Sequence, residues 1–207
     1  MQFTKEDLTK DIDKYSEILF DIEIKFGLYN CIFEKINDNN FDDIIKKYGA
    51  LFPHVCTSLI ATVIVRLCSL LMDDKNSKNI YKLIRCVESN RKLIVDDSKY
   101  EIAMVNVKNI LEKNASILNK LKKYRDKGIA HLDTAFFHDQ ETLYSISKLT
   151  KEDYEQLLAT TRSILDGLWA LMGKDPMKLE DYYVNDSEKL FQDLAKLNSN
   201  IGSNKEE

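Results

Sequence analysis

The chain has 207 residues, of which 44% are hydrophobic and 31% are charged, a balance that is typical of a folded globular protein and excludes a fully disordered chain. The net charge is −4, from 30 basic and 34 acidic residues, which excludes a uniformly basic nucleic-acid-binding surface but not a local basic patch. Only 6 glycines and 2 prolines occur, so turns are scarce and a few long helices are expected.

The first third of the chain is predicted to be helical. Apolar residues recur at helical spacing over residues 4–36, and Thr4 with Asp7 has the spacing of a capping box. The polar residues 37–40 end this pattern. A long helix, or two joined ones, is therefore expected before residue 37.

The next segment predicts a short helix and then a strongly apolar one. The short helix covers residues 41–48 and is ended by Gly49. The following helix, with Pro53 in its first turn, runs to about Met72 and is apolar nearly all round. Because Arg66 and several hydroxyl side chains interrupt it, we expect a buried central helix and not a membrane span.

Three further helices are expected in the second half. Ser77 is predicted to cap a short helix that ends near residue 87, and a long helix is predicted to start at Ser98 and to run into residues 124–131. Thr150 and Asp153 have capping-box spacing and open a third helix, which Gly173 ends.

The C-terminal part predicts an amphipathic helix over residues 182–197 and a polar tail. We therefore expect an all-α bundle over residues 1–175, followed by an appendage over residues 176–207.

The cysteines show neither metal-binding nor disulfide spacing. They are predicted to be reduced core thiols, and the N-terminus has no apolar signal-peptide core, so a cytoplasmic protein is expected. The four are Cys31, Cys56, Cys68 and Cys86. No phosphate-binding glycine loop occurs, and no cofactor is expected.

The densest positive patch of this acidic chain lies at the predicted end of the long helix. Five basic residues occur within eight positions, against one acid, Asp126: they are Lys120, Lys122, Lys123, Arg125 and Lys127. His131 follows closely. A histidine can transfer protons at neutral pH, and an arginine can bind phosphate oxygens and stabilise their charge. Arg125 and His131 therefore have the chemistry needed to cleave a phosphodiester, although a solvated basic helix end would have the same composition.

The spacing of this pair does not make it a simple helix-face pair. Six residues at 100° each place Arg125 and His131 120° apart around a regular helix and about 9 Å apart along it. Gly128 could distort the helix, or a two-fold partner could present its own copy of the residues. Lys127 and His131, four residues apart, do share a face. A metal site formed by His131, Asp133 and His138 is a further alternative.

The string Tyr124-Arg125-Asp126-Lys127-Gly128-Ile129-Ala130-His131 resembles the signature of HEPN domains, in which an arginine precedes a histidine by a short interval. The fuller pattern, together with Asp133, is similar to the abortive-infection AbiU-like branch. Two other segments fit that branch: residues 66–74 and residues 149–153. The resemblance covers roughly residues 5–172.

The resemblance implies a bundle of four to five main helices that forms a homodimer with two motifs in one cleft. It implies a metal-independent endoribonuclease, in which the RNA's 2′-hydroxyl attacks the adjacent phosphate and leaves a 2′,3′-cyclic phosphate. His131 would be the general acid or base, Arg125 would bind the scissile phosphate and Asp126 would orient one of them. The lysines Lys127, Lys123, Lys122 and Lys120 would contact RNA.

The resemblance also implies biological partners. HEPN ribonucleases act in phage defence and as toxins, so an antitoxin protein is a candidate partner. HEPN toxins that are paired with nucleotidyltransferase antitoxins often carry a tyrosine two residues after the histidine as the modified residue, whereas this chain has Asp133 there. That departure argues against neutralisation by modification. Some HEPN proteins only bind nucleotide, RNA or a protein partner, and such a non-catalytic module is the alternative function.

Overall fold

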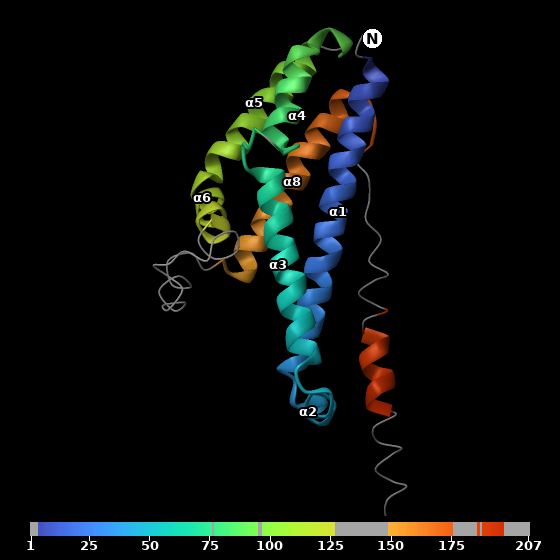
Figure 1. Cartoon of the computed structure of the whole chain (residues 1–207). Coiled ribbons are helices and arrows are strands. Elements are labelled where there is room, and N and C mark those ends of the chain that lie inside the picture. Colours follow the sequence, from blue (N-terminus) through green and yellow to red (C-terminus); the bar gives the residue numbers. More distant parts are fainter. Residues whose placement is uncertain are drawn as a thin grey trace, which may run out of the picture. The chain divides into compact units, whose positions relative to one another are not determined.

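The protein is described by a computed structural model that covers residues 4–75, 77–94, 97–126, 149–175, 186 and 188–196. Within these ranges every regular element is a helix (Figure 1). The predicted all-α class is confirmed for this part of the chain.

The described residues belong to two compact units. One contains the residues up to 21 together with residues 64–178, and the other contains residues 22–63 together with the residues from 179 onward. Two long helices, α1 (Lys5–Ile36) and α3 (Leu51–Leu71), contribute one part of their length to each unit. The predicted boundary between residues 175 and 176 remains a prediction.

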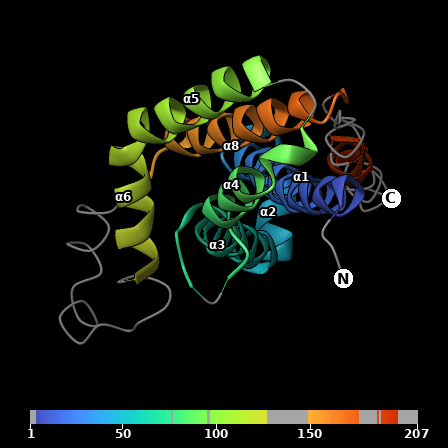
Figure 2. The same ribbon diagram turned by 90° about the horizontal axis from the view of Figure 1, so that it is seen from above.

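The first unit packs α4 (Ile80–Ser89), α5 (Asp97–Lys113), α6 (Ala115–Tyr124) and α8 (Lys151–Leu171) with the first half of α1 and the end of α3. A single 3₁₀ turn, Arg91–Leu93, follows α4. Helices α5 and α8 lie side by side in both views (Figures 1 and 2). The core of this unit consists of buried aliphatic residues at helical spacing, among them Leu8, Ile12, Leu19, Ile64, Leu67, Leu71, Ile80, Leu83, Leu121, Ile164 and Leu168.

Both predicted capping boxes and the predicted glycine end of α8 are confirmed. Thr4 and Asp7 exchange hydrogen bonds at the start of α1, and Thr150 and Asp153 form a complete capping box at the start of α8. Gly173, with φ of 71°, directly follows the C-terminal cap of α8. This left-handed conformation favours glycine, which has no Cβ to clash.

The single long helix predicted from Ser98 onward is wrong, because α5 and α6 are separate helices. Asn114 lies between them with φ of −98° and ψ of 8°, and its side-chain Nδ2 donates to the Ile110 carbonyl at 2.8 Å. An asparagine side chain that bonds to the preceding turn competes with continuation of the helix. Figure 2 shows the resulting change of direction between the two helices.

The predicted cap of α4 is also corrected. The N-cap is Asn79 and not Ser77, since the Asn79 side-chain oxygen accepts from the Lys82 N–H at 3.0 Å. The Asn79 Nδ2 donates to the Asp74 carbonyl at 2.9 Å, and the Tyr15 hydroxyl donates to the Asn79 carbonyl at 3.1 Å. This fully buried asparagine therefore joins α4 to α1 and to the turn after α3.

Helix α3 is less uniformly buried than its composition predicts. The buried positions concentrate in its second half, from Val63 to Leu71, while Thr57, Ser58 and Arg66 are exposed. Its length and composition would suffice to cross a membrane, contrary to the expectation drawn from its polar residues; core helices of soluble proteins meet the same criterion.

The second unit has a small aromatic core. It contains the 3₁₀ turn Asn39–Phe41, α2 (Asp42–Tyr48), parts of α1 and α3, and the helical residues 188–196. Phe191 is 1% exposed, and its ring lies 5.6 Å from that of Phe41 and 5.3 Å from that of Phe52. The described part of the predicted C-terminal helix thus packs Phe191, Leu194 and Ala195 into this unit, whereas Leu190 is 55% exposed.

Candidate functional site

The basic patch predicted from the sequence begins on α6, which presents two different faces. Ile117, Leu118 and Leu121 are buried in the first unit. Lys122 and Lys123 in the last turn are exposed. A buried thiol also joins α6 to α3, because the Sγ of Cys68 on α3 donates a hydrogen bond to the Leu121 carbonyl at 3.7 Å. Burial of the apolar face therefore directs the last lysines of α6 towards solvent.

The regular α-helix ends at Tyr124, and the chain continues through Arg125 and Asp126 with the wider winding of a π-helix. The Arg125 N–H points to the carbonyls of Leu121 and Lys122. Turns with π-helical winding are rare in proteins, and those that do occur are often found at functional sites. The angle of 120° between Arg125 and His131 was calculated for a regular α-helix. Because the regular helix ends at Tyr124, that angle does not apply to this pair.

Arg125 and Asp126 form a tight neighbouring pair. The Arg125 Nε lies 2.7 Å from the Asp126 Oδ1, and Nη2 approaches the same oxygen. The side chain of Arg125 is 27% exposed. A guanidinium has five N–H groups, so this contact fixes the fork while leaving others to bind an anion. The pair can therefore present a fixed positive charge at the end of α6.

Arg125 lines a groove of about 580 Å³ in the first unit. One wall is the outer part of α6, with Asn119 and Lys122 beside Arg125. The facing lining residues come from the end of α3, the turn after it and α4: Leu71, Met72, Asp73, Asp74, Lys75 and Tyr81. The groove thus brings together segments that are about fifty residues apart in the chain.

The negative charge of Asp73 in this groove is paired with a neighbouring arginine, Arg85. The Arg85 guanidinium donates to both carboxylate oxygens of Asp73, at 2.7 and 3.1 Å. These hydrogen bonds lower the pKa of Asp73 below its ordinary value of 3.8. Burial, with the Asp73 charge as a smaller cause, raises the pKa of Tyr81 and keeps its phenol neutral. The groove therefore combines a basic wall, a paired carboxylate and a neutral phenol.

The predicted RNA-contacting lysines have different surroundings. The Nζ of Lys120 lies 3.4 Å from the Asp153 carboxylate, which is only 17% exposed, so Lys120 is directed towards α8. Lys122 lines the groove, and Lys123 is exposed on the same turn. Lys127 lies outside the described residues.

Three segments that carry the family resemblance meet around α6. Asp73 and Asp74 line the groove, Arg125 belongs to its opposite wall, and Asp153 is paired with Lys120. The structure also brings Tyr81 into the groove, although nothing in the local sequence distinguishes it from an ordinary α4 residue. Its one signal is that it follows Asp73 and Asp74 closely in the chain, and only the fold places it in the same groove as Arg125.

The predicted histidine half of the site lies outside the described residues. His131 lies there, as do Asp133 and His138, the other two residues of the alternative metal site. No cluster of three or more potential metal-ligating side chains occurs among the residues that the structure does describe.

A comparison with protein families extends the resemblance over most of the chain. The model of the AbiU2 family, a HEPN family, matches residues 6–190. The chain belongs to the AbiU2 family of HEPN proteins. Membership accounts for the all-α fold and supports an abortive-infection function of HEPN type. Comparisons with curated proteins and with solved structures find no match for this AbiU2-family chain.

Proposed function

We propose that this AbiU2-family protein is a metal-independent endoribonuclease that acts in abortive infection. The observation that carries the proposal is the placement of Arg125. This arginine is held by Asp126 at the end of α6, where it lines a groove of about 580 Å³ beside Lys122. Such a groove offers a phosphate both a forked guanidinium and a second cation.

In the proposed reaction the 2′-hydroxyl of the RNA attacks its own adjacent phosphorus. A bond forms between the 2′-oxygen and phosphorus, and the bond from phosphorus to the 5′-oxygen of the next nucleotide breaks. The 2′-hydroxyl loses a proton and the departing 5′-oxygen gains one, with His131 as the group that moves a proton. The products are a 2′,3′-cyclic phosphate and a 5′-hydroxyl.

Arg125 has an electrostatic role in this reaction. Negative charge accumulates on the phosphate oxygens as the fifth bond to phosphorus forms, and a fixed guanidinium stabilises it without reorganisation. Asp126 is proposed as a positioning residue, because its contact with Nε and Nη2 restricts the arginine to one orientation. Lys122 and Lys123 would hold the flanking backbone by screened electrostatic attraction.

A homodimer with the two motifs in one cleft is part of the proposal. In such a dimer the arginine of one protomer and the histidine of its partner can meet across a two-fold axis, whatever the distance between Arg125 and His131 within one chain. An antitoxin protein is the proposed partner that would restrain such a nuclease.

The test is cleavage of labelled RNA by the purified full-length protein in the presence of EDTA. We expect scission to products with 2′,3′-cyclic phosphate ends, and we expect His131→Ala to abolish it while the helical circular-dichroism signal is unchanged. His54→Ala is the matched control, since His54 is an exposed histidine of α3. Light scattering should give the mass of a dimer.

Two outcomes would contradict the proposal. Cleavage that is untouched by His131→Ala would remove the assigned acid–base group. Salt-sensitive RNA binding with no scission would favour the alternative, a non-catalytic HEPN module that binds nucleotide, RNA or a protein partner.

A further inference from the structure

One aromatic side chain in the groove beside Arg125 has no part in the reaction proposed above. Tyr81, near the start of α4, lines this groove together with Arg125 and Lys122 from the end of α6. A tyrosine offers a ligand a flat apolar ring and a polar hydroxyl. The surroundings of Tyr81 show which of these a ligand in the groove would use.

Tyr81 differs from two core tyrosines of the first unit. Tyr15 is 5% exposed, and its hydroxyl donates to the Asn79 carbonyl at 3.1 Å. Tyr100 is 6% exposed, and the Arg91 guanidinium lies 4.6 Å from the centre of its ring. Tyr81 is only partly buried, and within the described part of the chain its side chain forms no hydrogen bond and no ring contact. Tyr81 is therefore placed as a residue of the groove and not of the core.

The groove also contains apolar lining, which a phosphate group does not require. Leu71, Met72 and Leu118 line it together with Tyr81. The side chain of a methionine is unbranched and polarisable, so it adapts to the shape of a ligand. An aromatic and aliphatic surface thus accompanies the two cations of the groove.

Positive charge in the groove is concentrated on one wall. Lys122 and Arg125 belong to the α6 side, whereas the facing turn carries Asp73 and Asp74 with a single lysine, Lys75. A phosphate is therefore attracted to the α6 wall. A volume of about 580 Å³ lies in the range of pockets that enclose whole small molecules. A ligand held by its phosphate at the α6 wall would place its uncharged part against the apolar lining.

We propose that Tyr81 forms a base-binding subsite, in which its ring packs against the base of the nucleotide whose phosphate lies against Arg125 and Lys122. That this nucleotide is part of an RNA rests on the proposed function. Aromatic side chains stack on any of the four bases, because every base has a π-face. The subsite therefore requires a base but selects only weakly among bases.

The test compares the binding of AMP with that of ribose 5-phosphate, which carries the same sugar and phosphate without a base. Isothermal titration calorimetry measures both ligands with the full-length protein in the absence of RNA. We expect AMP to bind about 5- to 150-fold more tightly, the range that stacking of one base on an aromatic side chain provides. CMP, GMP and UMP should also bind more tightly than ribose 5-phosphate.

Two variants of Tyr81 separate the ring from the hydroxyl. Tyr81→Leu removes the ring and keeps an apolar side chain, so the affinity for AMP should fall to that for ribose 5-phosphate, which should itself be unchanged. Tyr81→Phe keeps the ring and should retain the preference for AMP. Circular dichroism and urea unfolding verify that both variants keep the parental fold.

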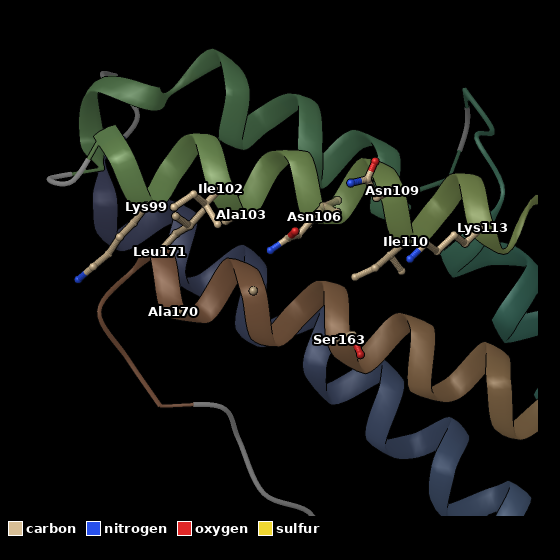
Figure 3. A pocket seen from close by; sticks show the side chains of 12 residues that line it. Lys99, Ile102, Ala103, Asn106, Asn109, Ile110, Lys113, Ser163, Ala170 and Leu171 are labelled. Carbon is tan, nitrogen blue, oxygen red and sulfur yellow. The ribbon is translucent and has the colours of Figure 1, made fainter.

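Two lysine variants locate the ligand. Lys122→Ala removes a cation of the α6 wall and should weaken both ligands to a similar extent, because they share the phosphate. A second groove of the first unit, of about 510 Å³, lies between α5 and α8 (Figure 3). Its lining within the described residues includes lysines but no aromatic side chain. Lys113→Ala in that groove is the matched control and should affect neither ligand.

Several results would overturn the base subsite. They are equal binding of AMP and ribose 5-phosphate, no binding of AMP, a preference for AMP that survives Tyr81→Leu or is lost in Tyr81→Phe, and binding that depends on Lys113 instead of Lys122. The nuclease proposal is scored separately with RNA. Cleavage that needs His131 in a protein without the AMP preference would reject the subsite alone, whereas a Tyr81-dependent preference without any cleavage would reject the nuclease alone.

Discussion

The two grooves of the first unit are similar in size but different in origin. The groove beside Arg125 measures about 580 Å³ and joins a helix end to a loop from elsewhere in the chain, with charges of both signs. The groove between α5 and α8 measures about 510 Å³, and its lining contains positive charge only. The first has charged residues on both walls, whereas the α8 wall of the second includes the small residues Ser163, Gly167 and Ala170.

The bend at Asn114 explains how one continuous stretch of sequence serves both grooves. Helix α5, before the bend, lies along α8 and forms the apolar groove, whereas α6, after it, carries its last turn to the charged groove (Figure 2). The comparison teaches that one change of chain direction, at Asn114, is enough to place a charged groove and a mainly apolar groove at different sites of a small helical unit. Substitutions that affect one groove and not the other test this separation.

The largest effect is expected at the charged groove. Arg125→Ala should lower the rate of RNA cleavage by about 100-fold or more, the range seen when one charge-stabilising donor is removed from an active site. Arg125→Lys should restore only part of the activity, because an ammonium cannot reproduce the forked contact with Asp126 and phosphate. Initial rates with labelled RNA measure both variants.

The control for Arg125 is another arginine of the first unit that is paired with an acidic side chain, at a more exposed position. Arg91→Lys alters an exposed pair with Glu101 and should leave the cleavage rate within a factor of about two. If Arg91→Lys slowed cleavage as much as Arg125→Lys, the charged groove would have no special place in the reaction.

The next effect concerns the turn that forms one wall of the charged groove. Asn79→Ala should destabilise the protein by about 1–3 kcal/mol, because a buried side chain loses the cap of α4 and the contact with the Asp74 carbonyl. Urea unfolding followed by circular dichroism measures the change. Ser77→Ala is the matched variant, and a cost as large as that of Asn79→Ala would show that Ser77 is the effective cap after all.

Two glycine substitutions distinguish a glycine inside a helix, Gly167, from a glycine that ends one, Gly173. Gly167→Ala should stabilise the protein by about 0.5–1 kcal/mol, since a Cβ there meets nothing and the helical backbone accepts alanine. Gly173→Ala should destabilise it by about 1 kcal/mol, because φ is +71° there. Thermal melting of both variants would contradict the interpretation of Gly167 if its alanine variant also melted earlier than the parent.

The smallest effect is a pH dependence at the acidic wall. Hydrogen bonds from Arg85 lower the pKa of Asp73, so the pair stabilises the folded state above the ordinary pKa near 3.8 and loses this contribution as the pH falls through the lower folded value. Asp73→Asn should therefore lower the urea midpoint slightly at pH 7 and progressively less below about pH 4. Arg85→Gln should show the same trend, and a constant difference at all pH values would exclude the pair as its cause.

The parts of the fold that could be predicted from the sequence are those determined by neighbouring residues. Thr150 and Asp153 form their capping box within one helical turn, and Gly173 adopts the positive φ that its position after α8 requires. Asn114 escaped prediction because apolar residues keep helical spacing on both sides of it. Its own side-chain bond to the Ile110 carbonyl breaks the helix without disturbing that spacing.

The candidate site was predictable in type but not in its surroundings. A dense run of lysine and arginine identified the end of α6, and Asp126 could be expected near Arg125 because it is the next residue. The facing wall with Tyr81 and the Lys120–Asp153 pair depend on contacts between distant segments. Periodicity reports which residues are buried, but it does not report which helix ends meet.

The carboxylate of Asp153 illustrates why genetic results on this protein will need careful reading. The same Oδ2 accepts the Thr150 N–H at 3.0 Å and receives the Lys120 ammonium at 3.4 Å. Its loss would therefore both fray the start of one helix and release a cation on another. A phage-survival screen that scores Asp153 as essential would not thereby identify a residue that touches nucleic acid.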